Sequence, residues 1–243
     1  MLHYDRIGNG EKLVLIHGFL GDCTIFNPIM GELQDHFDMI RIDLPGHGKS
    51  AVEKSSYSIY DYVEAISNIL KKERIVSATW LGHSMGGYIV LAALQKKTPS
   101  IEKAILAYTS TSADTAEAQK KRATQQQNII ANGVRPFVDN VMPAFFAPHA
   151  QDKDIEFAKQ IGYRANENGL IIALEAMKTR QDQTELLNTA TTPILIFEGT
   201  QDNIVKPINT DNIVVQKIIT NTGHLGMIEE PDAFTSGIKQ FLL

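Results

Sequence analysis

One stretch decides the fold of this chain of 243 residues: Thr79-Trp80-Leu81-Gly82-His83-Ser84-Met85-Gly86-Gly87-Tyr88. It places Ser84 in a Gly-x-Ser-x-Gly pentapeptide, between an apolar, strand-like segment and an apolar, helix-like one. A serine in this context is typical of a nucleophile elbow, a sharp turn from strand to helix that exposes the hydroxyl at the edge of a sheet. The flanking glycines fit such an elbow, because the two backbones nearly touch there and leave no room for a Cβ.

A base and a carboxylate must accompany a catalytic serine, since its hydroxyl is a poor nucleophile alone. In an elbow architecture they follow the serine in the order carboxylate, then histidine. Asp202 comes shortly after an apolar stretch at 193–197. His224 comes shortly after a second such stretch, at 214–219. Because the carboxyl ends of parallel strands meet at one edge of a sheet, we expect Ser84, Asp202 and His224 to meet there.

Other residues compete for these roles. Glu198 and Asp114 also lie near strand ends and remain alternatives to Asp202. None of the other histidines lies beyond the last strand, where the base is required; they are His3, His17, His36, His47, His83 and His149. Alternation along the strand before Ser84 predicts that His83 points away from the nucleophile.

A stabiliser for the oxyanion of the tetrahedral intermediate is expected near the N-terminus. The apolar stretch at 12–16 reads as a buried strand, and His17-Gly18-Phe19 follows it. Two backbone N–H donors are needed, one from the residue after the nucleophile and one from this early loop. The sequence thus predicts Met85 and Phe19 as the oxyanion-hole residues.

These motifs together resemble the α/β-hydrolase superfamily. The stretches that carry the resemblance run from one end of the chain to the other: 17–19, 43–50, 82–87, 199–202 and 223–224. The short insertion and the run 176–182 are most similar to the carboxylesterase, enol-lactonase and cofactor-free haloperoxidase-like group. The resemblance implies a mostly parallel, twisted sheet flanked by helices, with a small helical cap.

The order of the predicted elements also favours an α/β fold. Strands are expected at 38–43 and 101–108, and a helix at 58–73 with a capping box at Ser58 and Asp61. A last helix should begin at Pro231. The alternation stops between the two halves of the core, which we place at 1–112 and 190–243. The segment 113–189 is predicted to be the helical cap insertion.

The cap should cover the serine, exclude water and shape a pocket for substrate. Candidate substrate-binding residues, from the cap and from the catalytic loops, are Phe19, Met85, Met142, Phe145, Phe146 and Leu225. The aromatic and methionine residues of the cap, Phe137 among them, are candidate pocket lining. The alternative is that they only pack the cap onto the core. Arg180 and Asp182 are expected to tie the cap to the core.

The composition, with 43% hydrophobic residues and a net charge of −5, is that of an ordinary globular chain. The longest apolar run, 88–94, is too short to cross a bilayer, and no secretory signal is visible at the N-terminus. We therefore expect a cytoplasmic protein that binds neither membranes nor nucleic acid. A homo-oligomer is compatible with the sequence but not indicated by it.

No cofactor or metal is expected. The single cysteine, Cys23, excludes an internal disulfide, and no group of His, Cys, Asp or Glu has the sequence spacing of metal ligands. The run Gly48-Lys49-Ser50 resembles the end of a phosphate-binding loop, but Asp43 stands where that motif requires its first glycine.

The predicted activity is that of a serine hydrolase. It would cleave carboxylic ester or lactone bonds of a small to medium substrate through a Ser-His-Asp triad and an acyl-enzyme. The alternatives are a thioesterase, C–C hydrolase or lyase with the same triad, or a ligand receptor or signalling protein that retains the triad and turns over slowly.

Overall fold

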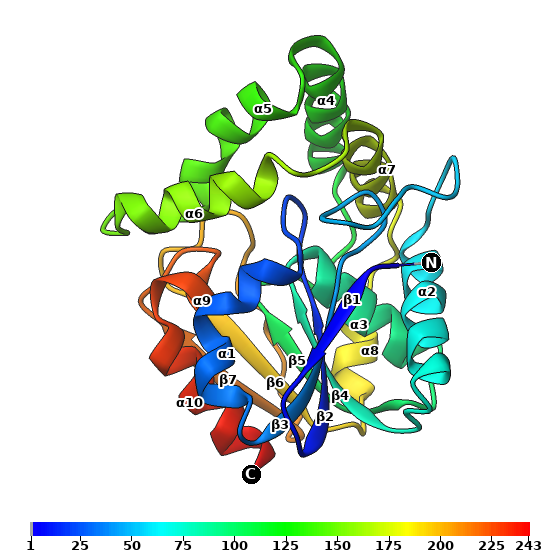
Figure 1. Ribbon diagram of the computed structural model, residues 1–243. Helices are drawn as coiled ribbons and strands as arrows, with labels where there is room; N and C mark the ends of the chain where they lie inside the picture. The colour runs from blue at the N-terminus through cyan, green and yellow to red at the C-terminus, as the bar shows by residue number, and fades with distance from the viewer. Residues whose placement is uncertain (1) are drawn as a thin grey trace.

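Seven strands form one sheet in the order β1-β3-β2-β4-β5-β6-β7, in a computed structural model that describes residues 2–243 (Figure 1). Only the edge strand β1 runs antiparallel to its neighbour, and the other pairs are parallel. The strands are β1 (Tyr4–Ile7), β2 (Glu11–Ile16), β3 (Phe37–Ile42), β4 (Ala78–His83), β5 (Ile101–Ala107), β6 (Ile194–Gly199) and β7 (Val215–Thr220). The predicted mostly parallel sheet is confirmed.

Helices cover both faces of this sheet (Figure 1). On one face α1 packs beside α10, and on the other α3 packs beside α2 and α8. The core helices are α1 (Asn27–Leu33), α2 (Ile59–Lys72), α3 (Met85–Gln95), α8 (Thr184–Thr189), α9 (Gly226–Glu229) and α10 (Pro231–Leu242), with the short 3-10 helix η1 (Cys23–Phe26). No helix within residues 2–243 is long and apolar enough to cross a membrane.

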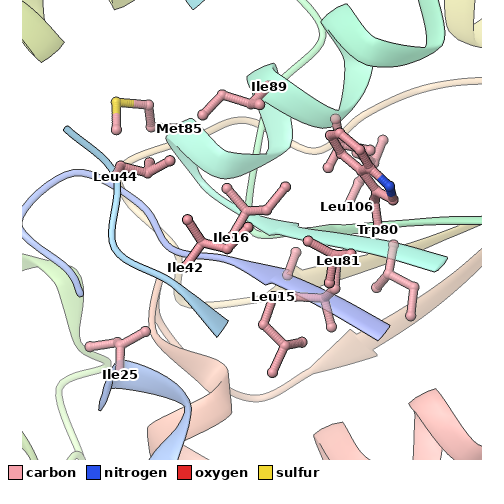
Figure 2. Close-up of a cluster of buried hydrophobic side chains, with 14 of the residues drawn as sticks. Leu15, Ile16, Ile25, Ile42, Leu44, Trp80, Leu81, Met85, Ile89 and Leu106 are labelled. Atoms are coloured by element: carbon pink, nitrogen blue, oxygen red, sulfur yellow. The ribbon is translucent and has the colours of Figure 1, made fainter. Parts of the chain in front are cut away.

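The core consists of apolar side chains on both sides of the central strands. Successive residues of a strand point to opposite faces, so a strand covered on both faces must be apolar throughout. Figure 2 shows Ile16 and Trp80 on the side of the sheet that faces α3, and Leu15 on the other side. All three side chains are fully buried.

Local sequence signals place the ends of two core helices. Ser58 caps α2, because its hydroxyl accepts the N–H of Asp61 while the Asp61 carboxylate accepts the N–H of Ser58. The predicted capping box is therefore present. Pro231 is the first residue of α10, where its missing N–H costs no hydrogen bond.

A group of helices lies over the carboxyl edge of the sheet and forms the cap (Figure 1). It comprises α4 (Ala116–Asn132), α5 (Val134–Val141), the 3-10 helix η2 (Met142–Phe145), α6 (Asp152–Gly162) and α7 (Glu167–Lys178). All of these elements come from the chain between β5 and β6, within the segment 113–189. The remaining helix of that segment, α8, packs beside α3 on the face of the sheet.

The cap touches the core closely near the loop after β3. The N–H of Asn166 donates to the carbonyl of Gly46, 2.9 Å away. Gly46 and Gly169 are in backbone contact, since a Cβ on Gly169 would lie 2.4 Å from the Cα of Gly46. Beside them, the Arg164 guanidinium pairs with the Asp22 carboxylate at 2.7 Å. These contacts fix the height of the cap above the sheet.

The turn from β4 to α3 has the tight geometry of an elbow. Ser84 has a positive φ of 51°, and its carbonyl accepts the N–H of Gly87. A Cβ on Gly82 would lie 2.2 Å from the carbonyl oxygen of Gly86, and a Cβ on Gly86 would lie 2.3 Å from that of Ile16. Glycine is therefore required at both positions by the close approach of backbone to backbone.

The Gly82→Ala variant is expected to lose about 3 kcal/mol of unfolding free energy, because backbone rather than a flexible side chain blocks the new methyl group. Urea denaturation followed by circular dichroism measures the loss. Gly31→Ala is the control: Gly31 also lies in a regular element, but a Cβ there meets nothing within 4 Å. Equal denaturation midpoints for the two variants would show that the elbow has more room than its geometry indicates.

Candidate active site

Ser84, His224 and Asp202 form a hydrogen-bonded line at the carboxyl edge of the sheet. The Nε2 atom of His224 lies 2.8 Å from the Ser84 Oγ, and its Nδ1 atom lies 2.8 Å from Asp202 Oδ2. Ser84 follows β4, Asp202 follows β6 and His224 follows β7. The structure therefore brings together the three residues that the sequence singled out.

The Asp202 carboxylate is oriented by the backbone beside it. Its Oδ1 atom accepts the N–H groups of Ile204 and Val205, at 2.7 and 3.2 Å. The other oxygen, Oδ2, is left for His224. The side chains of Asp202 and His224 are only 3% and 1% exposed, so water does not compete strongly for their hydrogen bond.

The two alternative carboxylates lie elsewhere. Glu198 accepts the N–H of Ile208 at 2.6 Å and lies 3.5 Å from the Lys217 Nζ. Asp114 pairs with Arg122 and Arg180 at the base of the cap. Neither carboxylate bonds to His224, so of these three Asp202 is the one that is placed to orient the imidazole.

His83 has a contact that strand alternation did not predict. Its ring lies against that of His224, with centroids 5.0 Å apart, and its Nε2 donates to the His224 carbonyl at 2.8 Å. Burial is the main cause that holds the pKa of His83 well below its usual value, and the nearby His224 lowers this pKa further. The imidazole is therefore neutral and serves as a hydrogen-bond donor. The expectation that it points away from the site was wrong, because the His224 loop lies where that side chain points.

The backbone N–H groups of Phe19 and Met85 both lack a hydrogen-bond acceptor within residues 2–243. Met85 is the first residue of α3, where N–H groups lack partners inside the helix. The loop before Phe19 is pressed against the nucleophile, since a Cβ on Gly18 would lie 2.9 Å from the Cβ of Ser84. Both predicted oxyanion donors thus lie in segments that border the serine.

Two buried histidines hold the loops around this site. His17 accepts the N–H of Leu44 at Nε2 and bonds the Gly18 carbonyl through Nδ1, at 2.9 and 2.7 Å. The His47 ring packs against those of His17 and Phe19. Burial lowers the pKa of His47 to about 3, so this ring stays neutral. The contacts connect the loops after β2 and β3.

The candidate substrate-binding residues include some whose rings contact other rings around the site and others that are almost fully buried. Phe145 lies edge-on to His224, with ring centroids 5.4 Å apart, and Phe19 meets the ring of Phe137 at 6.2 Å. Met142, Phe146 and Leu225 are almost fully buried, at 2%, 4% and 3% exposure. Phe137 is one of the aromatic cap residues that the sequence predicts as pocket lining. Its contact with Phe19 could not be predicted, because that contact depends on how the cap docks.

One group of side chains within residues 2–243 could hold a metal ion, although its sequence spacing gave no sign of it. Donor atoms of His3, Cys23 and Asp43 lie within 4.8 Å of one another. The Asp43 carboxylate already accepts the N–H groups of Cys23 and Lys49 and bonds the His3 ring. Because its oxygens are occupied, this carboxylate acts as an anchor for the loop after β3.

Arg180 ties the base of the cap to the core, as expected, whereas the hydrogen bonds of Asp182 stay within the segment 113–189. The guanidinium of Arg180 pairs with Asp114, donates to the Ser112 carbonyl at 2.6 Å and lies 4.1 Å from the Tyr88 ring centroid. Asp182 accepts the N–H of Ala113 at 3.1 Å. These bonds join the segment that enters the cap to the segment that leaves it.

The Asp114→Asn variant is expected to lose about 3 kcal/mol of unfolding free energy at pH 7, since it leaves Arg122 and Arg180 without their carboxylate. Burial alone would raise the pKa of Asp114, but the two guanidinium groups bring it below its ordinary value. The carboxylate therefore stabilises the fold at neutral pH, and this contribution disappears as the pH falls below about 4.

Urea denaturation between pH 7 and pH 3 measures this difference. The gap between wild type and Asp114→Asn should be widest at pH 7 and should close on acidification. Asp35→Asn, at an exposed position, is the control and should match the wild type throughout. A gap that does not change with pH would mean that the ionised form of Asp114 is not what stabilises the cap.

Comparison with known proteins agrees with this architecture. A family model described as the α/β-hydrolase fold matches residues 12–231. The hydrolase YugF of Bacillus subtilis (strain 168) is 28% identical over 268 residues, covering 99% of this chain and 92% of that protein. An esterase from Thermogutta terrifontis superposes with a TM-score of 0.92 at 25% identity, covering 99% and 92% of the two chains. The enol-lactonase from Burkholderia xenovorans LB400 has the same fold, with a TM-score of 0.90, 24% identity and coverage of 99% and 96%. The chain therefore belongs to the α/β-hydrolase family.

Proposed function

We propose that this hydrolase cleaves carboxylic esters or lactones, with Ser84 as the nucleophile. The observation that carries the proposal is the line of hydrogen bonds from Asp202 through His224 to the Ser84 hydroxyl. A buried imidazole that is bonded to a carboxylate at Nδ1 can accept a proton at Nε2. Ser84 supplies that proton as its Oγ attacks a carbonyl carbon.

The reaction has two halves. Ser84 Oγ adds to the substrate carbonyl, and the Phe19 and Met85 N–H groups stabilise the resulting oxyanion. His224 then gives its proton to the leaving alcohol, and an acyl-serine remains. A water molecule, deprotonated by His224, attacks the acyl-serine, and collapse of the second intermediate releases the acid and restores Ser84. Throughout, Asp202 holds the imidazole in the tautomer that can accept a proton at Nε2.

Two further observations support an ester or lactone as the substrate. The similar structure from Thermogutta terrifontis is an esterase. The ring of Phe145 lies against His224, and the ring of Phe19 packs against Phe137 of the cap; both can offer apolar surface to an acyl or alkoxy group. An uncharged carbonyl compound with a hydrocarbon arm fits these surroundings better than a strongly charged substrate.

The proposal is tested with a series of p-nitrophenyl esters, from acetyl to octanoyl, together with a fluorophosphonate that forms a covalent adduct with activated serines. Multiple turnovers and an adduct mapped to Ser84 by mass spectrometry are the expected results. An adduct at Ser84 with a single burst of product would instead favour a slow ligand receptor. A folded protein that gives neither turnover nor adduct would exclude the proposed reaction.

A further inference from the structure

The catalytic histidine is held through its backbone as well as through its ring. Its N–H donates to the carbonyl of Phe145 in the cap, with N and O 2.6 Å apart. Its own carbonyl accepts a hydrogen bond from His83 in the core. The position of the imidazole therefore depends on a contact with the cap as well as on the sheet beneath it.

Backbone meets backbone where the cap descends on the histidine loop. A Cβ on Gly223 would lie 2.6 Å from the amide nitrogen of Ala147 and 2.7 Å from the carbonyl oxygen of Phe145. No side chain separates the two segments there. Small displacements of the cap segment 145–147 are consequently passed directly to residues 223 and 224.

The carboxylate of Glu229, the last residue of α9, bridges these two segments. Its Oε1 accepts the N–H of Gly223 at 3.0 Å, and its Oε2 accepts the N–H of Ala147 at 3.0 Å. One bond goes to the residue before His224, and the other goes to the cap. The side chain is half-buried, so both hydrogen bonds are partly shielded from water.

This bridge requires a carboxylate, because each of its two oxygens must accept an N–H. An amide offers one accepting oxygen, and its NH₂ group would face a second N–H donor. Burial raises the pKa of Glu229, while the N–H groups of Ala147 and Gly223 act in the opposite direction. A half-buried carboxylate that takes no part in the proposed chemistry therefore lies beside the catalytic loop.

We propose that Glu229 is a positioning residue for His224. Its carboxylate locks the histidine loop to the cap segment 145–147, so that docking of the cap and alignment of the base occur together. The inference rests on the proposed function of His224 as the general base. Misplacing a catalytic group by about 1 Å can cost on the order of 100-fold in rate. Loss of the bridge should therefore act on kcat more than on KM.

The test compares Glu229→Gln with Glu230→Gln, which makes the same change in charge at the neighbouring residue. Both are assayed on the best p-nitrophenyl ester, at a temperature where both are folded. We expect kcat to fall about 10- to 100-fold in Glu229→Gln with a smaller change in KM, and to stay near wild type in Glu230→Gln. A folded Glu229→Gln protein with the kcat of the wild type would overturn the inference.

A second readout does not require activity. The low-field proton resonance of the His224 Nδ1–H bonded to Asp202 should shift or broaden in Glu229→Gln and stay in place in Glu230→Gln. If the wild type cleaves no ester, the proposed function fails, but this resonance still decides whether Glu229 positions His224. If Glu229→Gln does not fold, Ala147→Pro replaces the cap-side N–H with a ring methylene that cannot donate and that displaces the Glu229 carboxylate, and it should cause the same resonance change. An unchanged resonance would refute the role.

Discussion

Ser84→Ala is expected to lower kcat for the best p-nitrophenyl ester by about 10⁶-fold, if the triad acts as a unit. The reason is that the Ser84 Oγ, which lies 2.8 Å from His224 Nε2, is the atom that would carry the acyl group in the acyl-enzyme. Alanine also has a Cβ, so it adopts the backbone conformation of this position at a similar cost. The variant should therefore fold, and its thermal unfolding midpoint should lie near that of the wild type.

The measurement is steady-state turnover of a freshly purified variant, with fluorophosphonate labelling of the wild-type and the variant preparations as a count of active sites. The count in the variant preparation reveals contamination, since a trace of wild-type enzyme would dominate so low a rate. Turnover within tenfold of the wild type in a folded Ser84→Ala protein would mean that another group attacks the substrate.

Asp202→Asn should lower kcat by about 10⁴-fold, with little change in fold. The neighbouring backbone explains why. Two N–H groups, from Ile204 and Val205, point at Oδ1 and will hold the amide oxygen of the asparagine there. Its NH₂ group must then face Nδ1 of His224, which selects the tautomer protonated at Nε2. That imidazole has no free lone pair for the proton of Ser84.

Glu198→Gln and Asp114→Asn are the matched controls, because both carboxylates lie near strand ends but contact other partners. They should keep turnover within a few-fold of the wild type at temperatures where they are folded. The opposite pattern, with full activity in Asp202→Asn and a large loss in either control, would move the carboxylate role away from Asp202.

Much of this architecture could be predicted from local sequence. The glycines around Ser84 report a close backbone approach that occurs within a few residues, at the turn itself. Asp202 and His224 could be singled out because parallel strands all deliver their carboxyl ends to one edge. The capping box of α2 depends only on Ser58 and Asp61, three residues apart. In each case the deciding contact is local or follows from the topology of the sheet.

Other features depend on contacts between distant segments, and no local pattern reports them. The partner of the His83 ring is a loop 141 residues later in the chain. The contact between Phe19 and Phe137 exists only because the cap docks at one particular height. Glu229 looks like an ordinary polar residue before Pro231, because its two donors come from separate loops. The contacts of such residues form only when the cap and the core are folded against each other.

The strained backbone at Ser84 affects which residue directed evolution would favour at this position. A residue with a Cβ at φ 51° and ψ −113° costs on the order of 1–3 kcal/mol, whereas glycine adopts such angles freely. The most heat-resistant version of this elbow would therefore lack the hydroxyl. Directed evolution of this protein for heat resistance alone should enrich glycine at position 84, and a parallel selection that also demands product should keep serine there.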